Sequence, residues 1–136
     1  MKVIQDLWIC QDSGLVVFHR VFHEYVDVNL FGGFMSALNA YSSVLVEGGL
    51  SSFEIEEKRF TLFKKNGYMF ISSSPRKVKE NKVYEELKDI SDRFFDTYPT
   101  EFLANWCGDV SAFTNFEFEI QNSLLKVVEK FKKVFW

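Results

Sequence analysis

The sequence predicts an α+β fold in which helices flank a five-stranded antiparallel sheet. Three observations predict it: an apolar hairpin early in the chain, a helical segment over 29–47, and three short strands between 50 and 73. Two further helices, over 81–97 and from Thr114 onward, complete a β-β-α-β-β-β-α-α order. Because one helix must carry the chain from the hairpin to the later strands, we expect the strand order 2-1-5-4-3.

The hairpin joins strands over 3–10 and 15–22 that are apolar on both faces. Asp12 and Gly14 mark the turn, since aspartate can bond its own backbone there and glycine accepts a positive φ. Strands without a polar face are typical of the centre of a sheet. We therefore expect both strands to be centrally placed.

The helix over 29–47 takes Asn29 as its N-cap, ends before Gly48-Gly49 and has two unlike sides. A wide apolar side, expected to lie on the sheet, carries Leu30, Phe34, Ala37, Leu38, Tyr41, Val44 and Leu45. The opposite side is small and uncharged, and consists of Gly32, Ser36, Asn39, Ala40 and Ser43 beside an apolar shoulder of Phe31, Met35 and Val46. Because a solvent-facing helix side normally carries charges, this small-residue side predicts a covered surface.

Three antiparallel strands follow over 50–56, 59–65 and 68–73. Asn66-Gly67 separates the last two and is the strongest short hairpin signal. Polar and apolar residues alternate in the first two strands, which indicates one solvated face.

Two helices complete the chain. The helix over 81–97 stops before Pro99 and carries the apolar stripe Val83, Leu87, Ile90 and Phe94. After an irregular stretch over 99–112, the last helix begins with Thr114 as N-cap, Glu117 as its capping-box partner and a staple of Phe113 against Phe118. Its core stripe is Phe116, Ile120, Leu124, Val127, Phe131 and Val134.

Composition limits the classes of protein. The 136 residues suit a single domain over 1–136, and 47% hydrophobic with 18% aromatic residues excludes intrinsic disorder. A net charge of −3 disfavours general nucleic-acid binding. We expect a cytoplasmic protein, because no secretion signal or membrane span is visible and Cys10 and Cys107 lack CxxC spacing.

No pattern of residues indicates catalysis. His19 and His23 would stand about 13 Å apart along a continuing strand, too far for one metal ion. The serines lack His and Asp partners at recognisable spacing, and Gly32-Gly33 is no phosphate-binding loop. We therefore expect no enzyme activity, no metal and no cofactor.

The element order and three segments resemble the longin domain. "LWICQDSGLVVFHRVF" is similar to that family's first hairpin, "LFGGFMSALNAYSSVL" to its crossover helix, and "FEIEEKRFTLFKKNGYMFI" to its meander. The resemblance covers essentially the whole chain. The related roadblock fold begins with a helix before its first strand, and no such helix fits before Val3.

The resemblance implies a non-catalytic interaction module that binds small GTPases, SNARE segments or another longin-like chain, in the manner of trafficking proteins. The chain also resembles the short stand-alone longin-like proteins that are common in archaea. No SNARE heptads follow, so the resemblance does not extend to vesicle fusion. The alternative is a small-ligand sensor of profilin-like or PAS-like architecture, with a pocket between sheet and helix.

The small-residue side of the first helix is the predicted partner interface. Gly32, Ser36 and Ala40 recur at i, i+4 and i+8, which lets another backbone come close. In the longin architecture the trailing helices lie on the other face of the sheet, so we expect a homo- or heterodimer that also uses the edge strand over 50–56. The predicted interface is Phe31, Gly32, Met35, Ser36, Asn39, Ala40, Ser43, Ser52, Glu54 and Glu56. The alternative is that a trailing helix of the same chain covers this side.

A basic cluster of Arg76, Lys77, Lys79 and Lys82 precedes the second helix. The simpler interpretation is a soluble loop. The alternative is contact with an acidic partner or, peripherally, with an anionic membrane surface.

Overall fold

The computed structural model describes residues 4–21, 28–45 and 51–120. Its elements are β1 (Asp6–Gln11), β2 (Val16–Arg20), α1 (Val28–Leu45), β3 (Ser52–Ile55), β4 (Lys58–Lys65), β5 (Tyr68–Pro75), α2 (Glu80–Thr97), α3 (Thr100–Ala104) and the 3-10 helix η1 (Val110–Phe113). The five strands form one antiparallel sheet in the order β2-β1-β5-β4-β3. The predicted fold class and strand order are confirmed.

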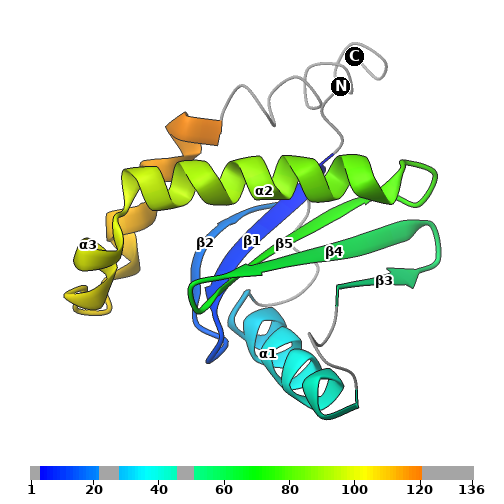
Figure 1. Cartoon of the computed structure of the whole chain (residues 1–136), viewed down its shortest axis with the longest axis horizontal. Helices are drawn as coiled ribbons and strands as arrows, with labels where there is room; N and C mark the ends of the chain where they lie inside the picture. The colour runs from blue at the N-terminus through cyan, green and yellow to red at the C-terminus, as the bar shows by residue number, and fades with distance from the viewer. Residues whose placement is uncertain (1–3, 22–27, 46–50, 121–136) are drawn as a thin grey trace.

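The sheet separates two layers of helix. α2 covers one face, and α1 lies against the opposite face (Figure 1). The layer under α2 is rich in aromatic side chains, among them Phe70, Phe94, Phe113 and Phe116, all fully buried. The layer under α1 is smaller, and its buried members are Cys10, Val16, Met35, Leu62, Met69 and Ile71.

Two tight turns set the register of the sheet as predicted. Asn66 and Gly67 both have positive φ, 51° and 79°, which is the geometry of a two-residue hairpin turn that follows the twist of the strands. Gly14 has φ 100° in the β1–β2 turn. β1 is central and buried along nearly its whole length, as its lack of a polar face predicted. The predicted central position of the second hairpin strand is wrong, because β2 forms an edge of the sheet. β2 is apolar on both faces because Val16 packs in the layer under α1 and Phe18 in the layer under α2.

Three predicted details of the helix ends are wrong. α1 begins at Val28, so Asn29 lies inside the helix and is not its N-cap. Thr114 follows η1 directly in helical geometry, and the Glu117 carboxylate accepts a hydrogen bond from Arg20 at 2.7 Å instead of closing a capping box. Phe113 is fully buried while Phe118 is 71% exposed, so the two form no staple.

The reason lies upstream of Thr114. The stretch over 99–112 is partly helical, and Asp109 caps η1 by accepting from the Ser111 amide at 3.0 Å. The Thr114 amide donates to the carbonyl oxygen of Ser111, so Thr114 continues the turns of η1 and does not start a new helix. The apolar residues Phe116 and Ile120 are buried as predicted, whereas the rest of that stripe and Gly48-Gly49 lie outside the described residues.

Candidate protein-interaction surface

α1 is turned the opposite way to the prediction. Met35, assigned to the partner-facing shoulder, is fully buried against the sheet. Leu30, Phe34 and Tyr41, expected on the sheet, are 69%, 57% and 66% exposed. The wide apolar side of the helix therefore faces away from its own sheet.

Gly32 explains the orientation. A Cβ at this position would overlap the carbonyl oxygen of Gly14 and come within 2.6 Å of Val16 Cγ2. The small-residue side does admit a close backbone, as its spacing predicted. That backbone is the β1–β2 turn of the same chain rather than a partner or a trailing helix.

Hydrogen bonds also hold the small-residue side of α1 against the rest of the chain. The Ser36 hydroxyl donates to the carbonyl oxygen of Asp12. Lys64 Nζ donates to Asn39 Oδ1 at 2.8 Å, and burial lowers the pKa of this lysine. These contacts hold the helix to the β1–β2 turn and to β4.

Four predicted interface positions are therefore occupied by this chain. Gly32, Met35, Ser36 and Asn39 contact or bond the chain's own sheet and turns. Phe31 is half-buried, with its ring stacked on Trp8 at 4.2 Å between centroids. Ala40 is exposed, and the side chain of Ser43 lies outside the described residues.

The side that does face solvent is an apolar stripe. Leu30, Phe34, Ala37 and Tyr41 follow the spacing of one helix face, and all four are exposed. We call these four residues the α1 stripe. The hydrophobic pattern predicts a core position for these residues, but a helix without charged residues can bury either side. The Gly14 and Gly32 pair was the available signal, since close backbone approach needs glycine on both partners.

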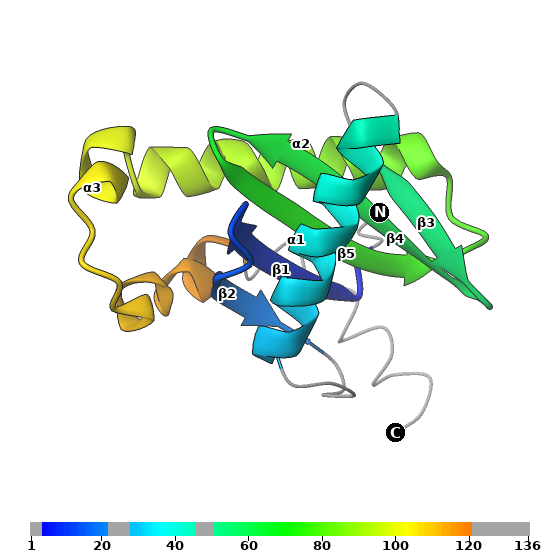
Figure 2. The same ribbon diagram turned by 90° about the horizontal axis from the view of Figure 1, so that it is seen from below.

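β3 forms one edge of the sheet beside this helix. Figure 2 looks onto the face where α1 crosses the strands and shows β3 as the outermost strand. In the described part of the chain β3 pairs with β4 alone, so its outer backbone edge is open. An open edge can pair with a strand of another chain.

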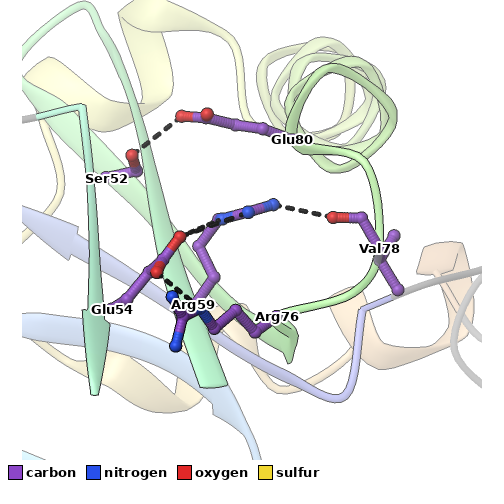
Figure 3. Close-up of polar contacts among 6 residues, drawn as sticks. All are labelled: Ser52, Glu54, Arg59, Arg76, Val78 and Glu80. Carbon is purple, nitrogen blue, oxygen red and sulfur yellow. Dashed lines mark hydrogen bonds and ion pairs between the residues drawn. The ribbon is translucent and has the colours of Figure 1, made fainter. Parts of the chain in front are cut away.

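The two sides of β3 differ in chemistry. Toward α2, the Ser52 hydroxyl donates to Glu80 at 2.8 Å, and Glu54 pairs with Arg59 at 3.2 Å and with Arg76 at 2.8 Å (Figure 3). Toward α1, Phe53 stacks on Phe60 with 4.9 Å between centroids. The polar side chains of β3 therefore bond to β4, to α2 and to the segment between β5 and α2. The outer backbone edge of β3 and its apolar side remain available to a partner.

Of the predicted residues on this edge, Ser52 and Glu54 lie on β3, but Glu56 does not. Glu56 has φ 53° and lies in the turn after the strand, which ends at Ile55. Glu56 and Glu57 together make the turn to β4, so the predicted strand over 50–56 runs one residue too far at its C-terminal end, and at the other end β3 begins only at Ser52. Ile55, which the prediction omitted, is the exposed apolar residue at the end of the strand.

A half-buried aromatic strip connects the stripe to the edge. Trp8, Phe31, Phe53 and Phe60 lie on the α1 side of the sheet, with Trp8 and Phe60 6.2 Å apart between centroids. None of these four rings is fully buried. The α1 stripe, the aromatic strip and the β3 edge therefore form one largely apolar surface.

The basic cluster lies beside the other face of β3. Arg76 is paired with Glu54, whereas Lys77, Lys79 and Lys82 are exposed at the start of α2. Contact of this cluster with an acidic partner or a membrane stays a prediction. No helix in the described residues is long and apolar enough to cross a bilayer.

The described residues offer little for catalysis. They contain no group of three or more potential metal ligands, His19 is exposed on β2, and His23 lies outside them. Cys10 and Cys107 are both free thiols. Cys10 is buried under α1, and burial raises its pKa to about 12, which makes it a poor nucleophile at neutral pH.

Comparison with solved structures identifies the fold as roadblock/longin-like. Myxococcus xanthus MglB gives a TM-score of 0.56 at 10% identity, over 69% of this chain and 85% of that one. The gliding protein MglB of Thermus thermophilus gives 0.53 at 10% identity, over 65% and 73%. A Roadblock/LC7 domain from Streptomyces avermitilis gives 0.53 at 10% identity, over 68% and 87%. The sequence itself matches no family model and no curated protein.

Proposed function

We propose that this protein is a non-catalytic interaction module that pairs with a second longin-like chain through the α1 stripe and the β3 edge. One observation carries the proposal: a helix with exposed Leu30, Phe34 and Tyr41 lies on the same face as an open edge strand. Burying one large apolar side chain contributes about 1.5–3 kcal/mol, so a partner that covers all three would gain a substantial part of its binding free energy from this one helix.

The geometry favours a second copy of this chain as that partner. A two-fold axis beside α1 would set the stripe of one copy against that of the other, so each apolar side chain meets an apolar surface. The same axis would bring two β3 edges together and extend the sheet. In support, one solved MglB structure with this fold, at a TM-score of 0.51 and 11% identity, is described as having a tetrameric arrangement.

Phe34→Glu tests the pairing. Light scattering at micromolar concentration should show a dimer for the unchanged chain and a monomer for the variant, because the substitution puts a charge at the centre of the stripe. Phe118→Glu is the matched control, since Phe118 is equally aromatic and 71% exposed but lies on the terminal helical turns. An unchanged chain that is monomeric, or a variant that stays dimeric, would refute the interface.

A small GTPase is the proposed further partner of the dimer. The resemblance to longin domains supports it, and so does the scarcity of catalytic groups among the described residues. Affinity capture from lysate of the source cells, loaded with GDP or a non-hydrolysable GTP analogue, should enrich a small GTPase in one nucleotide state. Binding of the purified GTPase should then be measured directly. Equal recovery in both states would argue against nucleotide-dependent binding.

A further inference from the structure

An open surface cavity of about 490 Å³ lies where the chain leaves α2, and its lining residues all fall within 101–112. Six of the seven lining residues are exposed, and Trp106 is half-buried. α3 and η1 lie beyond the C-terminal end of α2, at the opposite end of the molecule from β3 (Figure 1). Its size is within the range of sites that hold a small ligand or an inserted side chain. It is independent of the proposed dimer interface.

Two aromatic rings in the wall are held in place without any ligand. The Trp106 indole N–H donates to the carbonyl oxygen of Asp109 at 2.8 Å, and its ring lies 4.9 Å from that of the buried Phe113. The Phe102 ring lies 5.7 Å from that of Tyr98. Fixed aromatic faces bind planar or cationic groups with little loss of side-chain entropy.

The charges around the cavity are all negative. Glu101 and Asp109 line it together with the uncharged Asn105, Cys107 and Ala112, and no basic residue is among the lining residues within the described chain. Hydrogen bonds from Ser111 lower the pKa of Asp109, so this carboxylate stays ionised well below neutral pH. A positively charged group therefore finds both an aromatic surface and a counter-charge.

We propose that this cavity receives an arginine side chain from a partner polypeptide. The guanidinium would stack on Trp106 or Phe102 and pair with Glu101 or Asp109. A planar guanidinium suits this combination better than a lysine ammonium, because it can stack on a ring and present paired donors to a carboxylate at once. A neutral apolar ligand would desolvate the two carboxylates without compensation.

Nuclear magnetic resonance of the full chain tests the proposal with a minimal probe. N-acetyl-arginine amide should shift the Trp106 indole N–H signal in a saturable manner, and Trp106→Phe identifies that signal among the three tryptophans. N-acetyl-citrulline amide, which has a neutral urea in place of the guanidinium, should bind at least about tenfold more weakly, because it lacks the charge-assisted hydrogen bond.

A matched pair of variants locates the site. Glu101→Gln should weaken binding of the arginine probe about threefold to tenfold. Glu85→Gln on the exposed side of α2 should leave binding unchanged, and both variants should keep the melting temperature of the parent. Absence of a saturable shift, equal binding of the citrulline probe, or equal effects of the two variants would overturn the proposal. Tighter binding of tetramethylammonium than of the arginine probe would also overturn it.

Discussion

Within the described residues, three helical segments close the layer between the sheet and α2, whereas α1 alone closes the layer on the other face. Side chains from α2, η1 and the turns after it, such as Phe94, Phe113 and Phe116, fill the first layer. Over 30–41 of α1, Met35 is the one large side chain that is fully buried in the second layer, and the nearby Phe31 is half-buried. The layer under α2 has a fully buried core among the described residues. On the other face, α1 leaves Leu30, Phe34 and Tyr41 exposed unless a partner covers them.

The largest expected effect comes from breaking the α2 layer. Phe94→Ala removes a fully buried ring that lies within 6 Å of Phe70, Tyr98, Phe113 and Phe116. We expect the free energy of unfolding, measured with urea, to fall by about 3–5 kcal/mol.

Met35→Ala is the comparison in the α1 layer. Met35 is also fully buried, but its layer is smaller and is bordered by half-buried rings that can move inward. The loss should lie near the lower end of the about 2–5 kcal/mol typical of such a change. A larger loss for Met35→Ala than for Phe94→Ala would contradict the contrast between the layers.

Cysteine reactivity measures how tightly α1 closes its layer. Cys10 lies under α1 with its pKa raised to about 12 by burial, whereas Cys107 is exposed. At pH 8 Cys10 stays protonated and shielded, so a maleimide should label it at least about a hundredfold more slowly than Cys107. Mass spectrometry of proteolytic fragments resolves the two rates. Equal rates would show that α1 does not seal the sheet.

Two adjacent glycines test why α1 has its orientation. Gly32→Ala places a methyl group against the Gly14 carbonyl oxygen, so the helix must shift and the free energy of unfolding should fall by about 1–3 kcal/mol. At Gly33 a Cβ would meet nothing within 4 Å. Gly33→Ala should therefore stabilise the helix by about 0.5–1 kcal/mol. Thermal unfolding of the pair measures both, and equal effects would contradict the close approach.

The smallest effect is expected at the polar side of β3. Glu54→Gln weakens the pairs with Arg59 and Arg76, which are partly exposed, so stability should fall by less than about 1 kcal/mol. The loss should shrink further in high salt, which screens exposed pairs. Glu57→Gln in the adjacent turn is the control. A loss as large as that of Gly32→Ala would mean that β3 is anchored mainly by charge.

Much of the fold could be predicted because local patterns agreed with the global arrangement. The stripe Val83, Leu87, Ile90 and Phe94 is fully buried on α2, since the other side of that helix is charged and only one orientation is possible. Asn66-Gly67 fixed the β4–β5 register through its positive φ values. The predicted helix ends were wrong where another element competed for the same polar group. The Glu117 carboxylate, for example, accepts a hydrogen bond from Arg20 on β2 and does not form the predicted capping box.

The sequence by itself determined the strands, their order in the sheet and which side of α2 is buried, because period, turn chemistry and charge left one solution. Only the tertiary structure decided which side of α1 meets the sheet. That helix has no charge on either side, so its hydrophobic pattern allowed two orientations. The choice depended on steric fit between Gly32 and the Gly14 turn, residues 18 positions apart, and this fit leaves Leu30, Phe34 and Tyr41 exposed.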